Sequence, residues 1–352
     1  MQWIEPKPDH LDAISPSAVT TFEGCAKRLA YRRDPKTKVW IKRSTRTILG
    51  VVSHALTEEV LLGASPSGCE RREWLMGRWD YLLQEQVKIL QHEWPGRLIP
   101  LVETWRGYVA TRTRLLLRLE TTSEARSKAP GLTRGRELPE LPWVELRLSD
   151  ARLGLFGTPD LVEIQGDELR VVDLKSGVHQ RSITDSQERQ LRLYSHLVQA
   201  NYGRYADVLV IQDSRGREKY LDASKESIAL AVGQAVRAMD SFNSMAESGT
   251  FPASASSQLC SICEFQVVCH SYWESNRSDW SPVGACGQVT SLDGVVAVLE
   301  MPRGIEPIIT RVIPCDGVNF TVGEVVAISN LERAGNATGR MKWNSRLRRS
   351  PG

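Results

Sequence analysis

The sequence predicts a mixed α/β protein with a helical N-terminal region and a small all-β C-terminal region. Helical periodicity dominates to about residue 122, strands and helices alternate from Trp143, and short β-rich runs separated by Gly, Pro and Asp follow Pro282. A chain of 352 residues with 41% hydrophobic residues can bury the cores that such an order requires. We therefore expect three regions, at 1–142, 143–280 and 281–352.

The N-terminal region is expected to be mostly helical. Ser15 is a favourable N-cap and Pro16 a favourable first helical residue, so the first helix should run from about 16 to 33 and carry Cys25. Helical patterns continue along the chain to a polar linker rich in Gly, Pro and Arg. The further helices are expected at about 50–62, 70–92 and 102–122, and the linker at 123–142.

The central region is expected to contain a β-hairpin within a mixed sheet. The segment GTPDLVEIQGDELRVVDLKSG has apolar β-rich runs on both sides of the turn cluster Gln165-Gly166-Asp167. Residues 155–164 and 168–175 should therefore pair antiparallel. The strand WVELRL precedes this hairpin. A helix at 185–202, strands at 206–213 and REKYLD, and a helix at 223–247 follow it.

The hairpin places two acids and a lysine near its strand ends, namely Asp160, Asp173 and Lys175. Two carboxylates can hold a hard Mg²⁺ or Mn²⁺ ion, which polarises a phosphoryl oxygen and lowers the pKa of water. A lysine can orient that water or neutralise developing charge. This inventory is typical of a metal-dependent phosphodiesterase. The alternative is exposed acids beside a turn, with a lysine whose aliphatic stem lies along apolar surface.

The cysteines indicate a second metal site. Seven occur in the chain, an odd number that argues against a disulfide framework. Cys260, Cys263 and Cys269 lie close together in sequence, and a fourth ligand could be Cys25 or His270. Four thiolates would suit an iron–sulfur cluster or structural zinc, and spacing does not separate the two metals. Buried structural cysteines are the alternative, as is expected for the isolated Cys69, Cys286 and Cys315.

The net charge is only +3, but the positive charge is concentrated in two segments. Residues 25–46 hold nine Lys or Arg against one acid, and residues 331–352 hold six against one. Such patches with interleaved aromatic residues suit a nucleic-acid track, whereas the alternative is a solvated helix face and a frayed tail. No apolar run approaches the roughly 18 residues of a membrane span, and the N-terminus lacks a secretion signal. We therefore expect a cytoplasmic protein.

The C-terminal runs GVVAVLEM, PIITRVI and GEVVAISN are short, β-rich and separated by turn residues. They predict a small all-β domain of roughly 70 residues. An OB-like barrel is one interpretation, and an additional sheet packed on the main domain is the other.

Together these segments resemble the RecB-like branch of the PD-(D/E)XK nucleases. The similarity is to the iron–sulfur group that includes the CRISPR adaptation exonucleases and the nuclease domain of AddB. It covers about residues 14–275, with all the motifs in the family's order. They are SPSAVTTFEGCAKRLAYR, GVVSHALTEEVL, GTPDLV, VVDLKSG, QLRLYSHL and CSICEFQVVC. The resemblance implies a restriction-endonuclease-like mixed sheet flanked by helices.

The resemblance also implies roles for individual residues. His54 would be a metal ligand or its neighbour, Asp160 and Asp173 the metal carboxylates, and Lys175 the catalytic lysine. Gln190 and Tyr194 match the family's Q-x3-Y motif, which lines the DNA-binding cleft. Glu145, on the expected strand before the hairpin, weakly matches a position that is often acidic. The residues implied to ligate one [4Fe–4S] cluster are Cys25, Cys260, Cys263 and Cys269.

The implied function is a DNA nuclease that prefers single-stranded DNA ends and leaves a 5′-phosphate, in DNA repair, CRISPR adaptation or antiphage defence. Two alternatives stay open at this point. One is a nuclease-fold DNA binder that recruits a helicase or integrase and cuts little, and the other is a zinc-stapled transcription or repair scaffold. The chain departs from the adaptation nucleases by continuing for more than 80 residues after Cys269. Its terminal RMKWNSRLRR could extend a groove for single strands.

Overall fold

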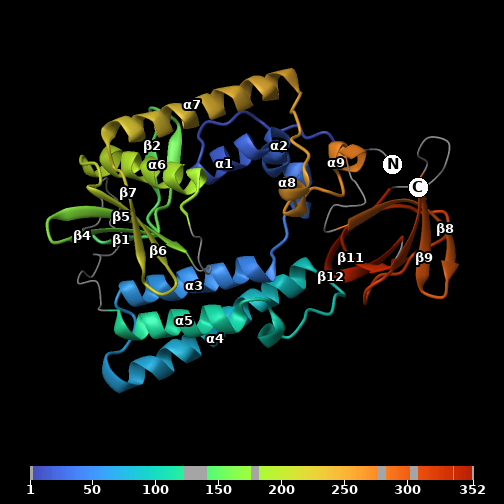
Figure 1. Cartoon of the computed structure of the whole chain (residues 1–352), viewed down its shortest axis with the longest axis horizontal. Helices are drawn as coiled ribbons and strands as arrows, with labels where there is room; N and C mark the ends of the chain where they lie inside the picture. Colours follow the sequence, from blue (N-terminus) through green and yellow to red (C-terminus); the bar gives the residue numbers. More distant parts are fainter. Residues whose placement is uncertain are drawn as a thin grey trace.

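The computed structural model has helices first, then a mixed sheet with helices, then a β-rich region, as the sequence predicts (Figure 1). The predicted linker falls almost entirely outside the described residues, as does the predicted boundary at 280, and the three domain limits stay predictions. None of the helices described is long and apolar enough to cross a membrane. The structure describes residues 3–122, 141–175, 182–275, 283–301, 308–335 and 337–350.

Three helices of the N-terminal region, α3 (Thr45–Leu61), α4 (Arg71–Glu93) and α5 (Tyr108–Thr121), pack around one apolar core. Trp79 is fully buried at its centre. The last helix begins at Tyr108 rather than at 102. Gly107 before it has φ +88°, a left-handed conformation that interrupts a helix and that glycine adopts without strain.

The predicted single helix over 16–33 is wrong, because two helices occupy it. They are α1 (Pro16–Gly24) and α2 (Ala26–Arg33). Cys25 between them is extended, with φ −163° and ψ 107°. The N–H of Lys27 bonds to the carbonyl of Pro252 at 3.1 Å, so the second helix is tied to the segment before the C-terminal cysteines. This break directs the chain at Cys25 toward that segment.

The central sheet has five strands in the order β1-β4-β5-β6-β7. The predicted hairpin is confirmed in part, since β4 and β5 pair antiparallel with Gln165 opposite Glu168. Its first strand is shorter than the predicted 155–164, because Leu155–Gly157 forms a separate strand that does not pair with β5. Strands β5 and β6 are parallel and are joined through α6 (Asp185–Tyr202), as a parallel pair requires a crossover. The strands are β1 (Trp143–Val144), β4 (Leu161–Gln165), β5 (Glu168–Lys175), β6 (Val208–Asp213) and β7 (Glu218–Leu221).

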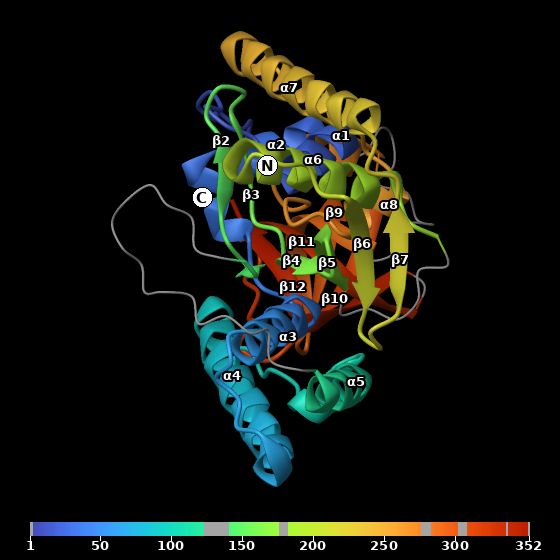
Figure 2. The same cartoon turned by 90° about the vertical axis from the view of Figure 1, so that its left-hand side faces the viewer.

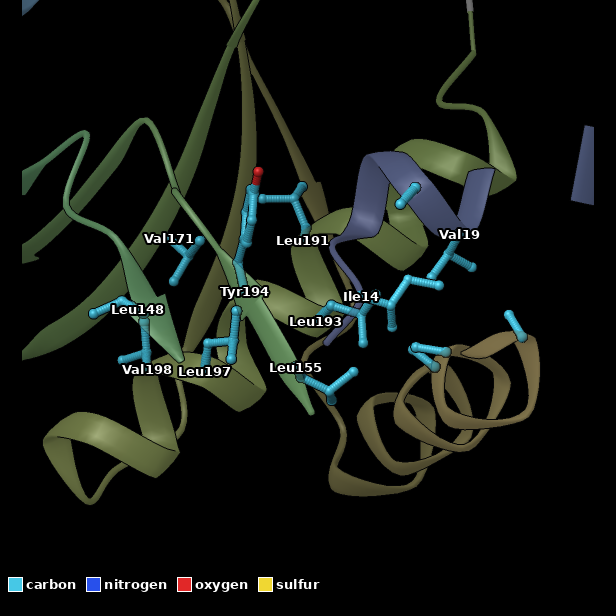
Figure 3. Packing of buried hydrophobic residues seen from close by; sticks show 14 of the residues in the cluster. Ile14, Val19, Leu148, Leu155, Val171, Leu191, Leu193, Tyr194, Leu197 and Val198 are labelled. Carbon is cyan, nitrogen blue, oxygen red and sulfur yellow. The ribbon is translucent and has the colours of Figure 1, made fainter. Parts of the chain in front are cut away.

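Helices cover both faces of this sheet. On one side lie α6, α1 and α7 (Lys225–Ser248), and on the other lie α3 and α5 (Figures 1 and 2). The first side buries the main core, where Leu191, Leu197 and Val198 of α6 pack against Val171 of the sheet (Figure 3). A small sheet of β2 (Leu148–Asp150) and β3 (Leu155–Gly157) joins this core. The hairpin is thus enclosed by elements from both regions.

The C-terminal strands form a closed barrel in the order β10-β12-β11-β8-β9, with β10 and β12 parallel. The segment RMKWNSRLRR belongs to β12, so it is a barrel strand and not a frayed tail. Trp343 of this strand packs edge-on against Trp94 at the end of α4, with centroids 5.8 Å apart. The barrel strands are β8 (Val283–Asp293), β9 (Val296–Met301), β10 (Ile308–Ile313), β11 (Val325–Gly335) and β12 (Thr338–Arg349).

A buried ion cluster fastens the C-terminal cysteine segment to α2. Glu264 lies between the short helices α8 (Ser257–Ser261) and α9 (His270–Ser275). Its Oε2 accepts from Arg28 Nη2 at 2.7 Å, and its Oε1 accepts from Arg32 Nε. The Glu264 side chain is 8% exposed. Although burial acts to raise its pKa, the two arginines hold the pKa below its ordinary value.

We predict that Glu264→Gln lowers the free energy of unfolding by about 3–5 kcal/mol, because it leaves two guanidinium groups without their counter-charge. Denaturant unfolding at neutral pH measures this. Since the pKa of Glu264 is depressed, its contribution is present above about pH 4.5 and is lost as the pH falls below that value. Glu274→Gln is the matched control, as Glu274 is 61% exposed and should change stability little. Equal stability of both variants would contradict the role of the cluster.

Candidate active site

The hairpin brings the predicted acids and lysine together at one end of the sheet. Asp160 immediately precedes β4, and Asp173 and Lys175 lie near the end of β5. Two residues apart on a strand, Asp173 and Lys175 point to the same face. Lys175 Nζ lies 2.6 Å from Asp173 Oδ2. The strand period places Asp173 on the face that α6 covers. Lys175, at the end of the strand, also lines a cavity with His54 of α3.

Asp160 is held by contacts from both sides. Its Oδ2 accepts the backbone N–H of Leu174 at 2.5 Å, which fixes the carboxylate across the hairpin. Its Oδ1 lies 3.6 Å from Nδ1 of His54, which comes from α3 on the opposite layer. Asp160 is 9% exposed, so its carboxylate is largely withdrawn from water.

Glu145 completes a compact group with these residues. His54 Nδ1 lies 2.9 Å from Glu145 Oε1, and the ligand atoms of His54, Glu145 and Asp160 all lie within 4.8 Å of one another. Glu145 follows β1 instead of lying on the expected strand. Its φ of +48° is a left-handed conformation that costs a non-glycine residue of order 1 kcal/mol. Its N–H bonds to the carbonyl of Asp160 at 3.2 Å and holds it there.

Gln190 of α6 contacts Asp173 from the other layer, and Tyr194 contacts Gln190. Being four residues apart, they lie on one face of the helix. Gln190 Nε2 donates to Asp173 Oδ1 and to the Tyr194 hydroxyl, both at 3.1 Å. The Tyr194 ring packs in the core with its hydroxyl directed away from the neighbouring apolar side chains (Figure 3). A Cβ at Gly157 would lie 2.7 Å from that ring, so this motif glycine provides the space for it.

The electrostatics of the group follow from burial of like charges. Burial and the charge of Asp173 raise the pKa of Asp160 to about 7. Burial also raises the pKa of Asp173, and Lys175 opposes that rise. The hydrogen bond to Glu145 raises the pKa of His54, although burial lowers it. The protein therefore does not by itself neutralise the negative charge that it gathers here.

The donor set has the chemistry of a hard divalent cation site. Carboxylate oxygens with one imidazole nitrogen suit Mg²⁺ or Mn²⁺, whereas thiolates are remote from this group. Such an ion would add the positive charge that the acids need. The site residues thus fit a divalent metal.

The four cysteines singled out in the sequence meet at a different place. Cys25, Cys260, Cys263 and Cys269 line one cavity of about 170 Å³. His270 does not line it and lies 3.6 Å from Glu274. Burial raises the pKa of Cys263 to about 12 and that of Cys269 to about 11, so these thiols hold their protons without a metal.

The sequence pattern of a nuclease superfamily matches residues 13–270. The chain belongs to the PD-(D/E)XK nuclease superfamily. The match includes the acids, the lysine and the four cysteines. This PD-(D/E)XK nuclease is also similar to the crystal structure of a protein from Eubacterium rectale described as a "putative exonuclease". The two are 12% identical with a TM-score of 0.42, over 77% of this chain and 91% of that chain. No curated protein matches the chain.

Sequence patterns gave little indication of two polar groups of this nuclease. Glu145 weakly resembled an acidic position, but its contact with His54 depends on the left-handed backbone after β1. Arg118 of α5 lines the cavity that also contains His54 and Lys175, and it belongs to no motif. Arg118 lies more than 50 residues from His54 along the chain, so no local sequence pattern indicates that the two line one cavity.

We predict that Asp160→Asn removes divalent metal binding without lowering metal-free stability. The raised pKa of Asp160 means that ionisation costs the folded state free energy, a cost that grows between about pH 4 and 7 and is complete at pH 8. Asparagine keeps an acceptor for the Leu174 N–H without that cost. Thermal unfolding at pH 8 with and without Mn²⁺ measures both effects, because a ligand of the folded state raises the melting temperature.

Asp167→Asn is the matched control, since Asp167 is an exposed acid in the turn of the same hairpin. It should retain the metal-induced rise in melting temperature that the wild type shows. A rise of equal size in Asp160→Asn would contradict the assignment of the metal site.

Proposed function

We propose that this PD-(D/E)XK nuclease is a divalent-metal-dependent deoxyribonuclease that hydrolyses phosphodiester bonds from the ends of single-stranded DNA. The observation that carries the proposal is the meeting of His54, Glu145 and Asp160 within 4.8 Å beside the Asp173–Lys175 ion pair. A domain that only binds DNA has no need to bury two acids against each other at a cost in stability.

His54, Asp160 and Asp173 would hold Mg²⁺ or Mn²⁺, which supplies Lewis-acid charge to the scissile phosphate when bound. Lys175, 2.6 Å from Asp173, is placed to donate a hydrogen bond to the attacking water and to neutralise charge on the phosphate. The in-line displacement would leave a 5′-phosphate and a 3′-hydroxyl. Glu145 approaches the same Nδ1 of His54 that faces Asp160, so its carboxylate would lie at the metal with theirs and offer a further oxygen ligand.

The contacts of Gln190 and Tyr194 favour a positioning role. Gln190 donates to Asp173, and the Tyr194 hydroxyl accepts from Gln190. The pair would hold Oδ1 of Asp173, so that Oδ2 of Asp173 stays paired with Lys175. Tyr194 is 7% exposed, so a direct contact of its ring with DNA is a lesser part of this proposal.

We propose that the four cysteines ligate one [4Fe–4S] cluster. The four residues line one cavity, which gives a place for a metal centre held by all four thiolates. The resemblance of the cysteine motifs to the iron–sulfur group of these nucleases favours a cluster over a single zinc ion. Lys27 and Arg28 line the same cavity and would offset the negative charge of four thiolates. The cluster would fasten the first helices to the C-terminal segment.

The barrel supports the choice of single strands. Its five strands, closed by a parallel pairing of the third and fifth, suit an OB-like fold, which binds oligonucleotides in a groove across its face. The basic residues of β12, among them Lys342 and Arg348, would contact the phosphate backbone of the single-stranded DNA. DNA repair, CRISPR adaptation and antiphage defence are processes in which such an enzyme would act.

We predict that Asp173→Asn and Lys175→Ala each slow degradation of end-labelled single-stranded DNA in Mn²⁺ by about 10²–10³-fold or more, because each removes charge aimed at the reacting phosphate. Lys219→Ala, an exposed lysine of β7 in the same sheet, is the matched control and should cut normally. Circular single-stranded DNA should survive where linear DNA is degraded. DNA binding without cleavage by the wild type would instead favour a recruiting subunit.

We predict about four iron atoms per chain in protein purified without oxygen, and loss of that iron in Cys263→Ser. Iron and zinc content together with visible absorbance measure this. Cys69→Ser is the control, because Cys69 is exposed and lies outside the cavity. A colourless wild type with one zinc per chain would overturn the choice of metal.

A further inference from the structure

A cavity of about 730 Å³ lies beside the candidate active site, between the helices α3 and α5 and the central sheet. It shares Thr57, Arg118 and Leu174 with a smaller cavity that His54 and Lys175 line. The two cavities therefore adjoin. A path lined by described residues leads from the candidate catalytic lysine into the larger cavity.

Arg118 lies where the two cavities meet, and its partners are neutral. One Nη donates to the Thr57 hydroxyl at 3.0 Å and the other to Gln212 Oε1 at 3.4 Å. No carboxylate among the described residues lies within ion-pair distance of it. A guanidinium has five N–H donors, so donors remain for a further acceptor. Burial lowers the pKa of Arg118, which reflects a cation withdrawn from water.

Two more arginines line the larger cavity. Arg114 comes from the same helix and Arg215 from the turn after β6. Neither side chain forms an ion pair with an acid that the structure describes. Glu163 is the acid in this lining, and it is paired with Arg170 at 3.5 Å. The cavity thus offers several positive charges with little negative charge to offset them.

Apolar side chains line the same cavity as these arginines. Leu61, Leu117 and Leu161 all line the cavity, and Leu117 is 56% exposed. A duplex presents mainly phosphates at its surface, whereas a single strand presents phosphates and the faces of its bases together. A lining that combines guanidinium and apolar groups suits the second kind of ligand.

We propose that Arg118 binds a backbone phosphate of a single nucleic-acid strand that runs from the larger cavity to Lys175. Arg114 and Arg215 bind further phosphates of the same strand. Thr57 and Gln212 hold the Arg118 guanidinium at the junction, so the phosphate that it binds sets how far the strand advances. The inference rests on the proposed nuclease function and assigns it a strand path and a phosphate-positioning residue.

The test measures binding of a fluorescent oligothymidylate, on the order of 15 nucleotides long, to the full-length protein in EDTA, where no cleavage occurs. Arg118→Gln should weaken binding about tenfold or more, as expected for a hydrogen bond to a charged group. It should also reduce the slope of log affinity against log salt concentration by about 0.7. Arg118→Lys should retain most of the slope, because it keeps the charge.

Arg112→Gln is the matched control. It removes the same charge from the same helix, but Arg112 pairs with Asp80 of α4, away from the cavity. It should bind like the wild type. Equal affinity and salt slope in Arg118→Gln and Arg112→Gln would overturn the proposal.

If Arg118→Gln fails to fold, oligonucleotide binding by Arg114→Gln and Arg215→Gln tests the strand path instead. Both side chains line the cavity, and neither forms an ion pair with a described acid. Unchanged binding in both would reject the strand path. Failure of the proposed function is seen separately, as a wild type that binds the oligonucleotide but does not cut it in Mn²⁺. If the wild type cuts normally and Arg118→Gln binds normally, the strand path is rejected and the proposed nuclease function is unaffected.

Discussion

The burial of two carboxylates beside each other is the constraint on which the rest of the site depends. Asp160 and Asp173 are 9% and 2% exposed, and like charges withdrawn from water destabilise the folded state. The groups that compensate come from separate elements: the imidazole of His54 from α3, the ammonium of Lys175 from β5 and the amide of Gln190 from α6. Burial raises the pKa of both acids, and these groups offset part of that cost only while both helix layers are held against the hairpin.

The barrel and the cysteine segment together hold those layers. On one side Trp343 of the barrel packs against Trp94 at the end of α4, in the core that α4 shares with α3, the helix that carries His54. On the other side Cys286 of the barrel shares a buried core with Tyr31 of α2. The Glu264 cluster then ties α2 to the segment between the last cysteines. The C-terminal barrel, which follows all the nuclease motifs in the sequence, therefore contacts both helical layers that the site requires.

Local chemistry explains which parts of this arrangement the sequence predicts. The turn at 165–167 and the alternation around it specify the hairpin, and the spacing of Gln190 and Tyr194 places both on one helix face. The break at Cys25 was not predicted, and the bond from the N–H of Lys27 beside it to the carbonyl of Pro252, more than 200 residues away, leaves no local signal in the sequence. The conformation of Glu145 is fixed in the same way by tertiary contacts. Sequence periodicity carries no information about such long-range bonds.

The acids of the site and the arginines of the larger cavity are separated, so they do not neutralise each other. An arginine in direct contact with Asp160 would neutralise it, and neither a cation nor a phosphate would then find a free partner. Between the acids and the arginine cavity lie Thr57 and Leu174, which carry no charge. Thr57 satisfies Arg118 in part without neutralising it, and the backbone of Leu174 does the same for Asp160. Neutral hydrogen bonds thus help to hold both side chains in place, and Asp160 pairs with none of the described arginines.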